Sequence, residues 1–197
     1  MERHLTMTEL EAESAALGQS PQDRGTLAMI VCRPAVDERL VLEQAELHLD
    51  EGLVGDNWQA RGSRHTQDGQ AHPEMQITLM NARVIQAVAE NRERWPLAGD
   101  QLFVDLDLSH ESLQPGHQLA IGTAVLEITA MPHNGCAKFT ERFGHDAIRF
   151  VNSREGRQLR RRGIYARVVQ PGIIRVGDTI RVRREVGLTA TGIRSKR

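Results

Sequence analysis

The sequence predicts a mainly β protein, a closed or half-open barrel with a few short helices, built as one domain of 197 residues. Short runs of β-prone residues, bounded by turn formers, recur from residue 26 to residue 183. Only one good amphipathic helix interrupts them, which argues against a parallel α/β sheet. We therefore expect an N-terminal helix and linker in residues 1–25, a barrel domain in residues 26–184 and a tail in residues 185–197.

The N-terminal segment is expected to form a short helix that ends before the barrel begins. Apolar side chains recur at helix-like spacing from Thr8 to Leu17 among several glutamates. Gly18, Pro21 and Gly25 then break the pattern, as in a linker.

The first strands are expected in TLAMIVCRP, EQAELHLD and QITLM, and the first of these is apolar enough to be buried. Between the second and third runs lies EGLVGDNWQARGSRHTQDGQAHPEM, which is rich in Gly, Arg, His and Gln and has little periodicity. Long irregular loops of this kind usually carry function, so we expect this loop near the site.

The amphipathic helix is expected in NARVIQAVAENRERW, with Asn81 as its N-cap. Three strands should follow in QLFVDLDLS, HQLAIG and AVLEITAMP. The last ordered segment, GIYARVVQPGIIRVGDTIRVRR, predicts a β-meander with turns at Pro171-Gly172 and Gly177-Asp178.

Composition excludes several classes of protein. The 25 basic and 26 acidic residues give a net charge of −1, and aromatic residues are few, so we expect neither nucleic-acid nor membrane partners. The two cysteines form no CxxC motif and no disulfide framework, which is typical of free thiols in a reducing cytoplasm. No uncharged run is long enough to span a bilayer.

The segment MPHNGCAKFTERFG is the most informative for chemistry. A strand ends at Pro132, Cys136 follows a glycine, and Lys138 and Arg142 come next at helical spacing. A helix start and a nearby cation both stabilise a thiolate, the form that attacks sulfur or binds a soft metal. The alternative is that Cys136 is a small buried hydrophobe. That second interpretation fits Cys32, which lies in the apolar run LAMIVC.

Five blocks of the sequence follow one another in a fixed order from about Gly52 to Val182: GLVGD, GDQLFVDLDL, LQPGHQLAIG, PHNGCAKF and GIYARVVQPGIIRVGD. They resemble successive blocks of the MOSC family, which is named after the C-terminal domain of molybdenum cofactor sulfurases. Their order and spacing are more specific than any single block. The resemblance implies a β-barrel-like fold in which Cys136 carries sulfur or ligates the molybdenum of a bound pterin cofactor.

Arginines form a second candidate group. Arg61 and Arg64 lie in the long loop, and on a helix through SREGRQLRRRG the side chains of Arg154, Arg157 and Arg161 would share a face. A pterin cofactor presents a phosphate or diphosphate, which the planar guanidinium fork can grip, with Lys138 as a point charge near the cysteine. The alternative is a solvated surface helix paired with neighbouring acids such as Glu155.

His133 and Asp56 complete the candidate site. His133 stands three residues before Cys136 and is expected to tune its thiol or line the pocket. A zinc site is the competing interpretation, but no second cysteine or paired histidine completes a ligand set. Asp56 and Asp100 are either polar groups of the pocket or ordinary residues of Gly-Asp turns; the turn is the favoured interpretation, and Asp56 is kept as a candidate.

The chain departs from the family pattern at two places. Many MOSC proteins have a histidine where this chain has Asn57 and Trp58, and an asparagine where it has Gln101. These differences indicate a subgroup with a different pocket. Larger relatives carry an upstream pyridoxal-phosphate-dependent cysteine desulfurase domain, for which the segment before the first block is too short. We therefore expect pyridoxal phosphate only in a partner protein.

Three functions follow as hypotheses. The first is a cofactor-dependent enzyme with Cys136 on molybdenum; the family resemblance implies reduction of N-hydroxylated small molecules, with electrons from a donor protein. The second is a non-enzymatic sulfur or metal carrier that is loaded by a separate desulfurase. The third is a degenerate barrel that serves as an interaction module, which would have an unreactive thiol.

Overall fold

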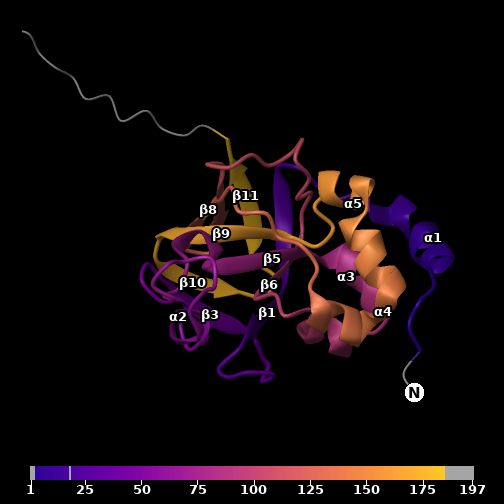
Figure 1. Ribbon diagram of the computed structural model, residues 1–197. Coiled ribbons are helices and arrows are strands. Elements are labelled where there is room, and N and C mark those ends of the chain that lie inside the picture. The colour runs from indigo at the N-terminus through magenta and orange to yellow at the C-terminus, as the bar shows by residue number, and fades with distance from the viewer. Residues whose placement is uncertain (1–2, 18, 185–197) are drawn as a thin grey trace, which may run out of the picture.

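The computed structural model describes residues 3–17 and 19–184, and it places a β-barrel beside a layer of helices (Figure 1). The predicted tail, residues 185–197, lies outside the described residues. In chain order the elements are α1 (Met7–Leu17), β1 (Arg24–Cys32), β2 (Leu40–Leu42), β3 (Gln44–His48), β4 (Gly52–Leu53), α2 (Trp58–Arg61), η1 (Pro73–Met75), β5 (Ile77–Asn81), α3 (Ala82–Ala89), η2 (Arg92–Ala98), β6 (Leu102–Asp105), β7 (Gln118–Ile121), β8 (Ala124–Ile128), α4 (Ala137–Asn152), α5 (Arg154–Gln158), β9 (Ile164–Gln170), β10 (Gly172–Arg175) and β11 (Thr179–Arg183).

The barrel closes because both ends of one sheet meet. Its strands run in the order β11-β7-β8-β9-β5-β6-β1, and β11 also pairs with β1. The β5–β6 pair is parallel, and α3 makes the crossover that a parallel pair requires. A smaller sheet has the order β10-β3-β4. The predicted mainly β barrel is therefore confirmed.

Strands β5 and β6, and the second half of β1 from Met29 to Cys32, are buried on both faces. Alternate side chains such as Leu79 point into the barrel, where aliphatic residues fill the interior. Their neighbours, such as Met80 and Phe103, point outward into a second core beneath the helices. This second core contains the aromatic rings of Trp95 and Phe143. Burial on both faces explains why these strands read as continuous apolar runs.

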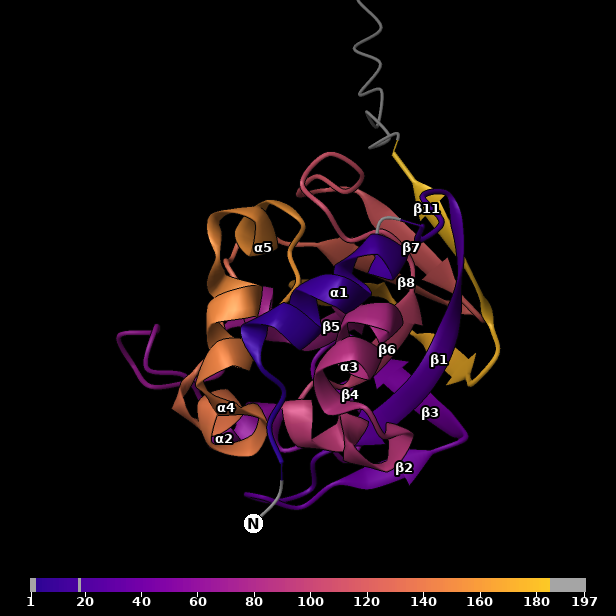
Figure 2. The same ribbon diagram turned by 90° about the vertical axis from the view of Figure 1, so that its right-hand side faces the viewer.

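The helical layer packs on this second core, and α1 lies across α3 (Figure 2). Leu10 of α1 is fully buried, so the N-terminal helix is part of the folded unit. Asn81 caps α3 as predicted, because its side chain accepts hydrogen bonds from the amides of Arg83 and Val84 at 2.8 and 3.2 Å. In the part of the chain that the structure describes, no helix has the length and apolar character needed to cross a membrane.

The predicted C-terminal β-meander is wrong in its pairing. The three strands form, and Gly177 has the positive φ of a turn. However, β10 pairs with β3, while β9 lies between β8 and β5, and β11 lies between β7 and β1. Turn residues mark where strands end, but closure of the barrel selects their partners.

Candidate functional site

Cys136 stands at the junction between the loop after β8 and the long helix α4. It is the N-cap residue of α4, its backbone is extended, and its thiol is exposed and makes no capping hydrogen bond. The preceding Gly135 packs closely on α4, since an added Cβ would come within 2.2 Å of Ile148 Cδ1 and that side chain would have to move. Its amide also donates to Asn152 Oδ1 at 3.0 Å. The loop is therefore fastened to α4, and the free thiol faces solvent.

Lys138 and Arg142, on the first turns of α4, both bind Asp37 in the loop after β1. Lys138 Nζ lies 2.9 Å from Asp37 Oδ1 and Arg142 Nη2 lies 2.7 Å from the same oxygen. The Lys138 hydrogen bond lowers the pKa of Asp37. Arg142 also donates to the Leu97 carbonyl at 2.8 Å. Lys138 is thus held by a carboxylate, beside the cysteine in sequence.

His133 lies in a buried polar cluster behind this loop. Its Nδ1 is 3.7 Å from Asp100 Oδ1, and neither atom has a hydrogen-bond partner among the described residues. Its ring lies against Tyr165, with centroids 4.4 Å apart. Burial, followed by the charges of Arg162 and Arg33, holds the pKa of His133 well below its usual value, so the imidazole is neutral.

Two buried ion pairs hold the backbone around Asp100. Arg162 Nη1 lies 2.7 Å from Asp100 Oδ2, and Arg162 Nη2 donates to the Ala98 carbonyl at 3.0 Å. Arg33 binds both carboxylate oxygens of Asp56 at 2.8 Å and donates to the Gly99 carbonyl. Burial raises the pKa of Asp100, although Arg162 opposes that shift. The Asp56 carboxylate is therefore already paired with Arg33 inside the protein.

A pocket of about 210 Å³ adjoins the cluster. Its walls carry Arg157, Arg160 and Arg162, together with His133, and no carboxylate side chain. Arg162 Nε has no hydrogen-bond partner among the described residues. Three guanidinium groups without an acid in the wall make the pocket suited to a small anion.

The arginines predicted from the sequence separate into different environments. Arg157 lines the pocket, but Arg161 does not. The prediction that Arg161 shares a helix face with Arg157 is wrong, because α5 ends at Gln158 and Arg161 lies beyond it. The Arg161 guanidinium instead lies 4.1 Å from the Phe150 ring centroid and 3.0 Å from Glu155. Its side chain is only 4% exposed, so it packs as a structural group.

The long-loop arginines lie apart from the pocket wall. Arg61 ends α2 at the surface, where desolvation and the nearby charge of Arg33 lower its pKa. Arg64 is exposed in the loop that follows. The proposed contacts of these two residues with a cofactor remain predictions.

Sequence reasoning missed Arg33 and Tyr165. It placed Arg162 among the basic residues without a role of its own, and it favoured a turn over a pocket group for Asp100. A signal was present in two cases, since Arg33 directly follows the buried run LAMIVC and Arg162 stands just before strand β9. A charge at the end of a buried strand needs a partner. Within the described residues, no group of three or more His, Cys, Asp or Glu side chains is placed to hold a metal ion.

Comparisons with known proteins agree with this architecture. A family model of the MOSC domain matches residues 64–181. The YUAD protein from Bacillus subtilis is 15% identical, with 81% of this chain and 95% of that chain covered at a TM-score of 0.62. YiiM from Escherichia coli is 16% identical, with coverage of 82% and 71% and a TM-score of 0.52. YiiM from Geobacillus stearothermophilus is 16% identical, with coverage of 84% and 78% and a TM-score of 0.52. No curated protein sequence matched.

The closed mixed barrel agrees with the MOSC family match, and the matched residues span more than half of the chain. The chain belongs to the MOSC domain family. The solved structures share its fold at low sequence identity.

The two cysteines should differ sharply in reactivity. Cys32 is buried, and burial raises the pKa of its thiol, whereas Cys136 is exposed. Alkylation of the folded Cys32→Ala variant should be fast, and alkylation of the folded Cys136→Ser variant should require unfolding. Mass spectrometry against time measures both rates. Equal rates in the two folded variants would contradict the assignment.

The neutral His133 should make stability depend on pH. The pKa of His133 is lowered in the folded protein. Below about pH 6.5 the unfolded chain therefore binds a proton at this residue that the folded chain does not bind, and stability falls as pH falls. Between about pH 7.5 and about pH 5.5, His133→Asn should lose less unfolding free energy than wild type, by about 1 kcal/mol. Urea titrations measure this difference. The exposed His145→Asn is the control and should follow wild type; identical curves for all three proteins would contradict the claim.

Proposed function

We propose that this protein binds a molybdenum-pterin cofactor, with the Cys136 thiolate as a ligand of the metal and the arginine-lined pocket as the seat of the cofactor's phosphate end. One observation carries the proposal: the exposed thiol stands two residues from Asn134, which lines that pocket. Two residues of chain span at most about 7 Å. A single ligand of pterin size can therefore reach both groups.

The residues present fit such a group. The thiolate is a soft ligand, which suits molybdenum, and the cofactor brings its own sulfur ligands, so a cluster of protein side chains is not needed. The pocket volume of about 210 Å³ suits a phosphate end but not the whole cofactor. The unpartnered Arg162 Nε and His133 Nδ1 are buried polar atoms at its wall, and ligand oxygens or water would satisfy them.

Each side chain then has a distinct task. Arg157, which has no ion-pair partner among the described residues, would bind phosphate oxygens directly. Arg160 donates to the Leu113 carbonyl at 2.8 Å, so it holds the wall in shape. Neutral His133 would position the loop without adding charge. The positive charge of Lys138 would favour an anionic group beside Cys136, while Lys138 remains bound to Asp37.

When bound, the cofactor would supply two-electron redox chemistry. By family resemblance, we propose reduction of N-hydroxylated small molecules, with electrons delivered by a separate donor protein. The exposure of Cys136 leaves room for substrate at the protein surface beside the cofactor. Arg61 and Arg64 belong to this proposal as further anion contacts from the long loop, and Asp56 would act by orienting Arg33.

A sulfur-carrier function is the second candidate, and the free exposed thiol favours it. The Cys136 thiolate would attack the outer sulfur of a persulfide on a pyridoxal-phosphate-dependent desulfurase. That sulfur would then bond to Cys136, and the desulfurase cysteine would leave as a thiolate. Cys32 is buried, so it is not available to resolve the new persulfide as a disulfide.

Cys136→Ser should abolish molybdenum retention while the fold persists, because serine is nearly isosteric and cannot supply a soft thiolate. Wild type and variant should be produced in a host that makes the cofactor, and metal, pterin and releasable sulfur measured in each. Metal and pterin in wild type alone support the first function. Releasable sulfur without metal supports the carrier. Equal loads in both proteins would contradict a cysteine-centred mechanism.

Arg157→Ala should affect phosphate binding, whereas Arg161→Ala should affect stability. Arg157→Ala should weaken binding of inorganic phosphate about tenfold, since a charge-assisted contact is lost, with little change in stability. Arg161→Ala should instead lower the unfolding free energy by about 1–3 kcal/mol, because it removes a buried stacking contact.

Calorimetry measures the phosphate affinity, and urea titration measures the unfolding free energy. The exposed Arg154→Ala on the same helix is the matched control and should leave both unchanged. Equal loss of phosphate affinity in Arg154→Ala and Arg157→Ala would remove the basis for a phosphate seat in the pocket.

A further inference from the structure

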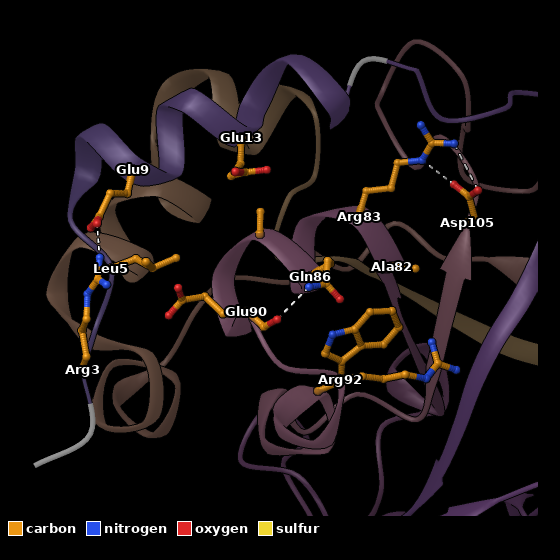
Figure 3. A pocket seen from close by; sticks show the side chains of 12 residues that line it. Arg3, Leu5, Glu9, Glu13, Ala82, Arg83, Gln86, Glu90, Arg92 and Asp105 are labelled. Carbon is orange, nitrogen blue, oxygen red and sulfur yellow. Dashed lines mark hydrogen bonds and ion pairs between the residues drawn. The ribbon is translucent and has the colours of Figure 1, made fainter.

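A larger pocket lies between α1 and α3, and it shares no lining residue with the arginine-lined pocket (Figure 3). Its volume is about 700 Å³, which is within the range of ligand sites for small organic molecules. The wall combines α1 and the segment before it with α3, η2 and the end of β6. None of these groups has a part in the function proposed for Cys136.

Part of the pocket wall is apolar, and it includes one hydrogen-bond donor without a partner among the described residues. Leu5, Ala82, Ala87 and Trp95 line it, and the Trp95 residue is only 4% exposed. The Trp95 indole Nε1 has no hydrogen-bond partner among the described residues. Buried indole N–H groups usually have a partner, so an acceptor is missing here.

Some charged groups of the wall are already paired. Arg3 forms an ion pair with Glu9, and Arg83 with Asp105 at 2.8 Å (Figure 3). The Arg92 guanidinium lies over the Trp95 ring, 4.8 Å from its centroid. These contacts account for the arginines that face the pocket.

The polar groups that remain are acceptors. Glu13 from α1 and Glu90 from the end of α3 extend toward the space between the helices (Figure 3). Their carboxylates have no hydrogen-bond or ion-pair partner within the described residues. The Gln86 amide nitrogen donates to the Glu90 carbonyl at 2.8 Å, so its own oxygen is left as an acceptor. Glu13, Glu90 and Gln86 therefore offer only acceptors to the space between the helices, and a positively charged donor would satisfy them.

We propose that this pocket binds a small organic cation that carries a primary ammonium group on an aromatic or alkyl body. The ammonium donates to the carboxylates of Glu13 and Glu90, and the apolar body packs on Trp95 and Leu5. Where the ligand body carries an oxygen, as in tyramine, that oxygen accepts from Trp95 Nε1. An anionic ligand is disfavoured because it meets two unpaired carboxylates. The pocket is a second ligand site, separate from Cys136.

Indole N–H signals in ¹H–¹⁵N NMR spectra test this proposal directly, because the chain has only Trp58 and Trp95, and Trp58→Phe assigns the two signals. The probes are n-butylammonium, 2-phenylethylammonium and tyramine. Matched neutral and anionic probes are 2-phenylethanol and phenylacetate. The ammonium probes should shift the Trp95 signal in a saturable way, and the matched probes should bind at least about fivefold more weakly.

Substitutions then locate the cation. Glu13→Gln and Glu90→Gln should each weaken ammonium binding about two- to fivefold, as expected for exposed charge pairs. Glu93→Gln, at an exposed position outside the pocket wall, is the control and should have no effect. Failure of all three ammonium probes to shift the Trp95 signal, equal binding of 2-phenylethanol, or an equal loss in Glu93→Gln would each overturn the proposal.

Discussion

The buried ion pair between Arg162 and Asp100 organises the functional end of the barrel. Arg162 lies two residues before β9, and Asp100 lies between η2 and β6, so one 2.7 Å contact joins the ends of two strands that are not neighbours in the sheet. The same guanidinium also holds the Ala98 carbonyl. Both side chains are almost fully buried, and removal of one partner from such a pair costs about 3–5 kcal/mol. The backbone segments around this ion pair are therefore held in place relative to one another.

His133 lies beside this ion pair, in the loop that leads to Cys136. The imidazole lies between Asp100, Tyr165 and the Arg162 charge, and this environment keeps it neutral. Three residues later the chain passes Gly135, which packs directly on α4, and presents Cys136 at the start of that helix. The position of the exposed thiol is thus set by buried groups that never reach the surface.

The barrel and the helical layer make two separate sites possible. Because β5, β6 and the second half of β1 are buried on both faces, helices must cover their outer face, and α4 brings Cys136 beside the pocket of Arg157 and Arg162. The same layer leaves a larger pocket between α1 and α3, with an acidic and apolar wall. One pocket has a wall suited to anions and the other a wall suited to cations, so their ligands would not compete.

Local sequence patterns determined the strands, the Asn81 cap, the burial of Cys32 and the helix start at Cys136, since each depends on residues close together in the chain. The resemblance of ordered blocks identified the family. Tertiary structure alone decided that β10 leaves the expected meander to pair with β3, that Arg161 turns inward while Arg157 lines a pocket, and that Asp100 joins Arg162 and His133. These outcomes depend on barrel closure and on the pairing of buried charges from distant segments, and neither leaves a periodic signal in the sequence.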